Sequence, residues 1–156
     1  SVDHDERLRR GLALQAMMLA LPGSLYLRQG DEIALSDSDK PTAPLELAAM
    51  VIEHTQGQAS QFGSPAATVR HAAHVRLEYN LACAPLAFVT GLEWCPAEAL
   101  AFLVRGVLVV VNTSDAPIVL PPEAKVLLSS QPLRQDQGRL LIPPTTATWL
   151  EATTVA

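Results

Sequence analysis

Four consecutive residues, Gln29, Gly30, Asp31 and Glu32, form the part of the sequence best suited to acid–base chemistry. Two carboxylates that act on one bond have to point at it together, one as acid and the other as base or nucleophile. Asp31 and Glu32 are adjacent, so in an extended chain their side chains point to opposite faces. We therefore expect this segment to be a solvated or hydrogen-bonded turn and not a catalytic pair.

A second set of candidate ligands, His71, His74 and Glu78, falls on one face of a predicted helix. Imidazole and carboxylate groups are ligands for zinc. Arg70 lies on the same face and would repel a cation. We favour a solvated helix surface, and we predict no metal site and no other cofactor.

Trp94 and Trp149 carry indole rings that could stack on a sugar ring. Tryptophans in a β-rich region are more often core anchors, because burial of an indole removes a large apolar area from water. Asn112-Thr113-Ser114 matches an N-glycosylation sequon. It stands at the end of a predicted strand and before Asp115, so we interpret it as a turn.

The amino-acid composition is typical of a folded domain with an aliphatic core. Of the 156 residues, 49% are hydrophobic and 17% are charged, which is typical neither of a disordered chain nor of a linker. The net charge is −5 and Lys and Arg form no cluster, so the sequence argues against nucleic acid or an anionic membrane as partner. The apolar run 12–21 is too short to span a bilayer, and the acidic residues 1–6 do not resemble an export signal. We expect a cytoplasmic protein.

The two cysteines, Cys83 and Cys95, form neither a CxxC motif nor a zinc spacing. We expect two free thiols, and the sequence leaves one disulfide open as the alternative.

The elements that carry these residues fall into two parts, 1–84 and 85–156. The first part is helical, with helices predicted at 6–21, at 44–54 and from Ser64-Pro65 onward, and with one short strand at 24–27. Asp5 is the expected N-cap of the first helix. In the third helix Val69, Ala73 and Leu77 share one face, which we expect to be the apolar one.

The second part is β-rich, and its short apolar runs are separated by turn residues. The predicted strands are 86–92, 99–104, 107–112, 118–120, 125–129, 139–142 and 146–150. Strands of this length and spacing favour an antiparallel β-sandwich. The expected fold class is therefore α+β, with helices first and a C-terminal β-sandwich after them.

The run 19–33 resembles one motif of the α-amylase superfamily, glycoside hydrolase family 13, and especially of its α-glucosidases and oligo-1,6-glucosidases. In this chain, as in the family, an apolar predicted helix is followed by Pro-Gly-Ser or Pro-Gly-Thr. A predicted strand with an aromatic residue comes next, and then Gln-Gly-Asp/Glu-Glu. In the family this is the last helix–strand step of a (β/α)₈ barrel. The resemblance covers 8–35 in this part of the chain. It implies that 1–84 contains the last helix and strand of such a barrel, a remnant of its end, followed by connecting helices.

The second half of the chain is also similar to this family, and its motifs follow in the family's order. The similar stretches are Ala99 with 102–105, then 109–114, 119–121, 126–130 and the ending 143–150, which is like that of actinobacterial members. Residues 36–63 match poorly, where the family usually has a longer insertion near the active site.

The resemblance implies retaining hydrolysis of α-glucosides. In that chemistry one carboxylate attacks the anomeric carbon and another, about 5 Å away, protonates the leaving oxygen. The family's nucleophile and acid follow barrel strands upstream of the stretch matched here, so we expect neither in this chain. The third family carboxylate stands in Asn-His-Asp, where this chain has Asp3-His4-Asp5. Asp5 is thus a weak catalytic candidate, and Gln29, Gly30, Asp31 and Glu32 are expected to support the site.

Three hypotheses follow from these observations. The chain is the C-terminal portion of a retaining α-glucosidase acting on α-glucosides such as malto- or isomalto-oligosaccharides, and is itself inactive. Alternatively, it is a non-catalytic carbohydrate-binding module. The third hypothesis is a structural module that self-associates, or binds a companion chain, through the apolar segment 12–27, because an open strand edge and an apolar face invite association.

Overall fold

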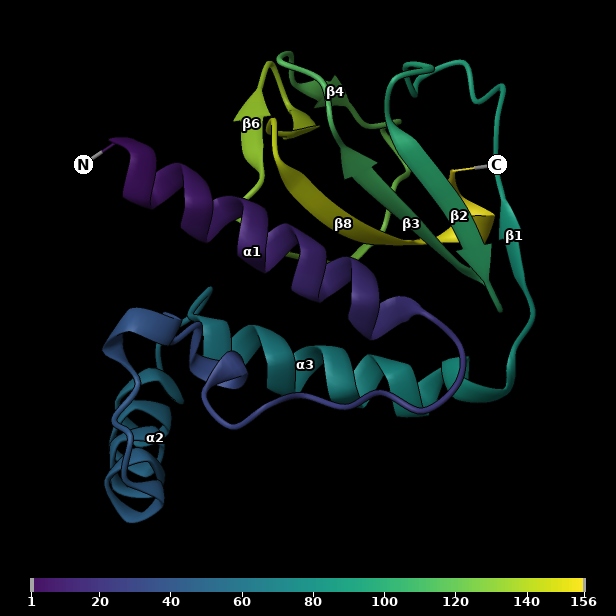
Figure 1. Cartoon of the computed structure of the whole chain (residues 1–156). Helices are drawn as coiled ribbons and strands as arrows, with labels where there is room; N and C mark the ends of the chain where they lie inside the picture. The colour runs from purple at the N-terminus through teal and green to yellow at the C-terminus, as the bar shows by residue number, and fades with distance from the viewer. Residues whose placement is uncertain (1, 156) are drawn as a thin grey trace.

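The computed structural model of the chain describes residues 2–155, in which helices precede antiparallel strands (Figure 1). The helices are α1 (Val2–Ala20), α2 (Pro44–Gln58) and α3 (Pro65–Glu78), with short 3-10 helices η1 (Asp31–Ile33), η2 (Asp37–Asp39), η3 (Leu81–Cys83) and η4 (Ala152–Thr154). The strands are β1 (Leu86–Phe88), β2 (Leu100–Val104), β3 (Val107–Asn112), β4 (Ile118–Val119), β5 (Val126–Ser129), β6 (Arg134–Asp136), β7 (Arg139–Ile142) and β8 (Thr146–Glu151). The predicted α+β class is confirmed, and the described part contains no closed barrel.

The strands form two antiparallel sheets, one of five strands in the order β1-β2-β3-β8-β5 and one of three in the order β4-β7-β6. β3 lies at the centre of the larger sheet, and all six of its residues are buried. Its run of β-branched residues suits a strand that is covered on both faces. The two-residue turn Arg105-Gly106 joins β2 to β3 with positive φ at both positions, the geometry that a tight hairpin requires.

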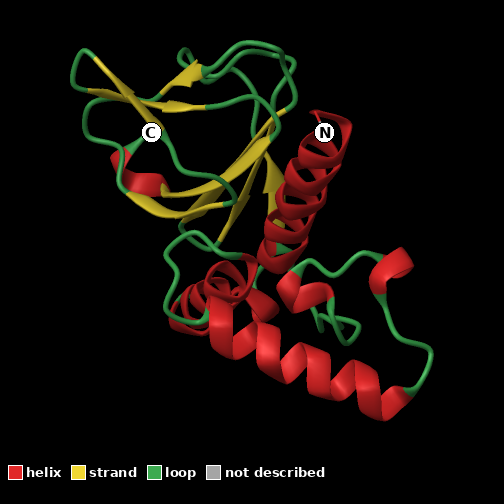
Figure 2. Cartoon of the chain, turned by 90° about the vertical axis from the view of Figure 1, so that its left-hand side faces the viewer, coloured by secondary structure: helices red, strands yellow, loops and turns green. Residues whose placement is uncertain are grey.

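One face of the five-stranded sheet packs against α1 and α3 (Figure 2). Every second residue of β3 contributes to this core, and Trp149 of β8 joins it from the neighbouring strand. The helices contribute mostly alanine, namely Ala13, Ala16 and Ala20 of α1 and Ala72 of α3. Small side chains allow the helices to approach the sheet and each other closely.

The other face of that sheet shares a second apolar cluster with the three-stranded sheet. This cluster contains Leu108 and Val110 of β3. It also contains Ile118 of β4 and Ile142 of β7. The side chains of β3 therefore alternate between the two clusters, as the period of two in a strand requires. α2 lies apart from both clusters, and its buried Val51 contacts a small third cluster with Ile33 and Ala66.

The strand expected at 24–27 is absent. Ser24 to Leu27 has no regular secondary structure, and within residues 2–155 its backbone pairs with no other strand. A strand is stabilised by hydrogen bonds to a neighbour as well as by its own residues. No neighbouring strand lies beside this segment within residues 2–155, so the prediction of a strand was wrong.

Two predictions about helices also need correction. α1 begins at Val2 and not at Glu6, so Asp5 is an exposed residue of the first helical turn and not the N-cap. A carboxylate there still opposes the positive end of the helix dipole. In α3 the buried residues are Ala66, Ala72 and Val75, whereas Leu77 is largely exposed. The small side chain of Ala72 fits against α1, which turns the buried face away from the predicted one.

Cys83 and Cys95 are both free, and burial raises the pKa of the Cys95 thiol. Among residues 2–155 no helix is both long enough and apolar enough to cross a membrane. Trp149 is fully buried, and Trp94 is half-buried with its indole N–H donating to the carbonyl of Val155 at 3.3 Å. Trp149 is thus a core residue, as predicted, whereas Trp94 packs against the second cluster only in part.

Candidate functional site: the turn after the first helix

The turn that follows α1 is held in place by an arginine from α3. The guanidinium of Arg76 donates to the carbonyl oxygens of Leu19, at 2.9 Å, and of Leu21 and Gly23. The last carbonyls of a helix lack partners inside the helix, and a cation also favours this negative end of the dipole. Arg76 therefore fixes the direction in which the chain leaves α1.

Gly30 gives the later turn, at 29–32, its shape. Its φ is +99°, which is in the region that favours glycine, and a Cβ placed on it would lie 3.3 Å from Leu35 and Lys40 side-chain atoms. The Gly30 carbonyl accepts from the backbone N–H groups of Ile33 and Leu35. The predicted turn at 29–32 is present as this loop followed by η1.

The two carboxylates of the turn fold back onto its own backbone. Glu32 accepts from the Gly30 N–H at 2.7 Å, and Asp31 accepts from the Arg28 N–H at 3.0 Å. The Asp31 carbonyl also accepts from the Gln15 amide of α1 at 2.7 Å. Hydrogen bonds to charged acceptors are stronger than neutral ones, so the two carboxylates stabilise the turn.

Two cations, Lys40 and Arg28, lie beside Asp31 and join it to Asp37. Lys40, whose side chain is mostly buried, lies 3.6 Å from the Asp31 carboxylate and 2.9 Å from that of Asp37. Arg28 lies 3.7 Å from each of the same two carboxylates. The hydrogen bond from Lys40 and the charges of Lys40 and Arg28 hold the pKa of the Asp37 carboxyl below its usual value. The cluster is an ion-pair network that joins the turn to η2.

In this geometry both carboxylates already accept hydrogen bonds from the backbone of the turn. General acids and bases need a carboxyl group that is free to exchange a proton with substrate. Asp31 and Glu32 are instead each tied to a backbone amide, and Gln29 is exposed. Asp5 lies in the first turn of α1, and the structure does not bring it into this hydrogen-bond network.

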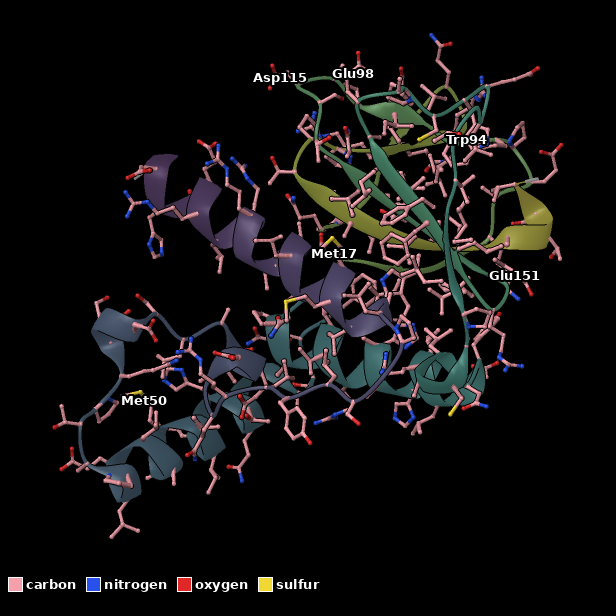
Figure 3. All side chains as sticks on the ribbon, turned by 45° about the vertical axis from the view of Figure 1, so that its right-hand side comes forward. Met17, Met50, Trp94, Glu98, Asp115 and Glu151 are labelled. Carbon is pink, nitrogen blue, oxygen red and sulfur yellow. The ribbon has the colours of Figure 1, made fainter. Side chains whose placement is uncertain are left out.

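The other sequence candidates lie elsewhere. Within residues 2–155 no three His, Cys, Asp or Glu side chains are grouped so as to hold a metal ion. His71 instead contacts the carbonyl oxygen of Leu127 at 2.7 Å, at the irregular step in the pairing of β5 with β8. Trp94, the remaining candidate, borders a hollow on the strand side of the molecule. Glu98 and Asp115 border the same hollow, which lies away from Met50 on α2 (Figure 3).

The sequon at Asn112 is a structural turn. The Asn112 side chain is fully buried, and its amide donates to the carbonyls of Ala116 and Ile142 at 2.8 and 3.0 Å. Its oxygen accepts from the backbone N–H of Ser114 at 3.1 Å, which is an Asx-type turn. A glycan cannot be attached to this side chain in the folded protein.

Sequence reasoning missed two residues of the site, Lys40 and Arg76. Lys40 follows Asp37 at a spacing of three residues, a recurrent spacing for ion pairs, and this signal was available in the sequence. Arg76 is separated from the carbonyls it binds by more than fifty residues. No local pattern could have identified that contact.

Substitution of Gly30 tests how far this turn depends on its backbone geometry. Gly30→Ala places a side chain at positive φ against Leu35 and Lys40, and we expect it to lower the free energy of unfolding by about 1–2 kcal/mol. The measurement is urea unfolding followed by circular dichroism.

Gly11→Ala is the matched control, because Gly11 is a helical residue of α1 with open space at its Cβ. There alanine should raise the stability by about 0.5–1 kcal/mol. Effects of the same sign at both positions would contradict this account of the turn.

Comparison with known proteins shows a likeness of fold. No protein-family model matches the sequence, and no curated protein sequence matches it. Three solved structures align with nearly the whole chain. They are Ttha1563 from Thermus thermophilus (24% identity, TM-score 0.50), the α-glucosyl transfer enzyme XgtA (18%, 0.56) and the Group B Streptococcus pullulanase SAP (13%, 0.54).

The alignments cover 94%, 91% and 93% of this chain but only 31%, 35% and 28% of those three proteins, in the same order. The chain thus spans about a third of the length of the structures that it matches. Two of the three are named as enzymes that act on carbohydrates. The helices and sheets described above therefore have the fold of one part of larger proteins, carbohydrate-active enzymes among them.

Proposed function

We propose that the chain is the C-terminal portion of a retaining α-glucosidase, and that it supports an active site whose catalytic carboxylates lie in another part of that enzyme. The observation that carries the proposal is the turn at 29–32. Its carboxylates stabilise the backbone by accepting hydrogen bonds from the N–H groups of Gly30 and Arg28. Its sequence, Gln-Gly-Asp-Glu, resembles the site-supporting turn of the α-amylase superfamily.

Two further observations support this proposal. The fold is like that of about a third of an α-glucosyl transfer enzyme and of a pullulanase. The apolar cluster shared by the two sheets fits the C-terminal β-sandwich that the family resemblance implies, with 1–84 as the end of a barrel and 85–156 as the sandwich. A cytoplasmic location belongs to the same proposal.

Activity measurements test the proposal. The 156-residue chain should show no turnover of a nitrophenyl α-glucoside, whereas a polypeptide extended by the coding sequence upstream of Ser1 should release nitrophenol. Turnover by the short chain that Asp5→Asn abolishes would contradict the proposal. An extended polypeptide that folds but has no activity on α-glucosides would also contradict it.

A carbohydrate-binding module is the second candidate function, and the carbohydrate-active structural neighbours favour it. Calorimetric titration of the 156-residue chain with malto-oligosaccharides separates the two candidates. A binding module should give saturable heats, whereas the supporting portion of an enzyme should give none.

A further inference from the structure

α2 is attached to the rest of the fold by few buried side chains. Of its fifteen residues only Val51 is buried, and its apolar residues Leu45 and Ile52 are 86% and 59% exposed. The helix lies away from both sheets (Figure 1). Segments with few buried apolar contacts open at a lower free energy than the core of a protein. α2 is therefore a candidate for opening on its own.

α1 and α3, in contrast, are anchored against the large sheet. Within the apolar segment 12–27, the residues buried against the sheet and α3 are Ala13, Ala16, Leu19 and Ala20. That segment as a whole is therefore not exposed. Within residues 2–155 no residue of α2 belongs to either of the two large apolar clusters. Movement of α2 can thus leave both clusters intact.

α2 depends on its contacts with the rest of the chain to stay helical. Ala43 is its N-cap, and this residue has no side chain that could accept a hydrogen bond from the first turn. Val51 and Thr55 are β-branched residues in its interior, which lowers the helix propensity. Isolated helices of about this length are marginal in water. Loss of the docking contacts would therefore also destabilise the helix.

The cluster that docks α2 also contains the residues that close the turn at 29–32. Val51 packs there with Ile33 and Ala66, and Leu35 packs against the same cluster. The backbone N–H groups of Ile33 and Leu35 donate to the Gly30 carbonyl at 3.3 and 2.9 Å. The buried side chain of α2 thus covers the two residues whose backbone closes this turn.

Gln58, the last residue of α2, makes a second connection to the same place. Its amide oxygen accepts from the Ala66 N–H at 3.1 Å, and its amide nitrogen lies 3.5 Å from the Ile33 carbonyl oxygen. The Gln58 carbonyl also accepts from the Ser64 hydroxyl at 2.8 Å. The first N–H groups of a helix lack partners inside it, so Gln58 supplies one of these partners to α3.

The chain before α2 has its own attachment to the turn. Lys40 lies 3.6 Å from the Asp31 carboxylate and 2.9 Å from that of Asp37. These ion pairs keep 36–40 beside the turn and do not involve α2. The part of the chain that can move with α2 therefore extends from 41 to 62, and we call this part the α2 arm.

We propose that the α2 arm undocks from the rest of the fold as one unit, and that its undocking loosens the turn at 29–32. In the undocked state Ile33 and Leu35 lose the side chain of Val51 that covers them, whereas the sheets keep their packing against α1 and α3. Any event that displaces the arm then alters the turn. The proposal rests on contacts inside this chain and does not depend on the sugar chemistry proposed above.

Hydrogen exchange of the 156-residue chain, measured by mass spectrometry where exchange reports the opening equilibrium, tests the proposal. Val109→Ala weakens the large sheet at a fully buried position, so exchange in β3 and β8 should become about tenfold faster. Exchange in the α2 arm and in 30–35 should stay unchanged, because the sheet remains folded when the arm undocks. Equal acceleration in all these segments would show that the arm opens only in global unfolding, and would overturn the proposal.

Val51→Ala tests the connection between the arm and the turn. Exchange in the arm and in 30–35 should become faster by the same factor, about tenfold, because one opening exposes both. Gln58→Ala removes the amide that joins the arm to α3 and to the turn, and it should act in the same way. Ile52→Ala is the matched control at an exposed position of α2 and should change exchange less than about threefold.

Two results would contradict the connection to the turn. One is faster exchange in the arm with unchanged exchange in 30–35, in both the Val51 and the Gln58 variants. The other is an equal effect of Val51→Ala and Ile52→Ala. None of these readouts involves sugar, so failure of this proposal is distinguishable from failure of the proposed function.

Discussion

Trp149→Ala is expected to lower the free energy of unfolding by about 3–5 kcal/mol, the usual cost of removing a large aromatic side chain from a core. Trp149 is fully buried, pairs with Val109 of β3 and belongs to the cluster between the five-stranded sheet and the helices. Its indole N–H also donates to the carbonyl of Ala16 at 3.1 Å, which joins β8 to the middle of α1. Urea unfolding followed by tryptophan fluorescence and circular dichroism measures the change.

Two controls separate packing from the hydrogen bond. Trp149→Phe keeps an aromatic ring but removes the N–H donor, so we expect a smaller loss of about 1–2 kcal/mol. Trp94→Ala removes an indole that is only half-buried, so its effect should be smaller than that of Trp149→Ala. Equal losses at Trp94 and Trp149 would contradict the assignment of Trp149 as the main core anchor.

Arg76→Met is expected to lower the free energy of unfolding by about 3 kcal/mol, because hydrogen bonds to charged groups contribute more than neutral ones. Methionine keeps much of the apolar stem but leaves the carbonyls of Leu19, Leu21 and Gly23 without their donor. Urea unfolding gives the global effect. Tryptic cleavage after the exposed Arg28 reports on the turn itself, and it should become faster in the variant.

Arg70→Met is the matched control for Arg76, because Arg70 is an exposed residue of the same helix. Its effect on stability should be within about 0.5 kcal/mol. Unchanged cleavage after Arg28 in the Arg76 variant would show that the arginine does not hold the turn.

The strands that could be predicted best are those whose own residues and flanking turns agree. β3 and β7 have the predicted bounds, since a short β-branched or apolar run is limited on each side by turn residues. β6, at Arg134–Asp136, was missed because all three of its residues are polar and exposed. An edge strand of this kind is defined by its pairing with β7, which local sequence does not show.

At the candidate site, too, local sequence predicts the turn but not the long-range contacts that hold it. A turn at Gly30 could be predicted, because glycine followed by two acidic residues is a local signal. The amide of Gln15, which contacts the Asp31 carbonyl, lies far from the turn in the sequence, and so does Arg76, which holds the chain between α1 and the turn. The buried face of α3 was also predicted wrongly. Two of its buried residues, Ala66 and Ala72, are alanines, which allow close helix packing but add little to the apolar periodicity of a sequence.

The bond between Trp149 and Ala16 also has a consequence for the way the chain folds. The two residues are separated by 133 positions, so the main core cannot close until almost all of the chain has been synthesised. Until then the alanine-rich side of α1 lacks the sheet that covers it. Contacts of such long range slow folding and leave apolar surface open to aggregation. We therefore expect a chain that ends before β8 to leave this side of α1 uncovered and to give a low yield of folded protein.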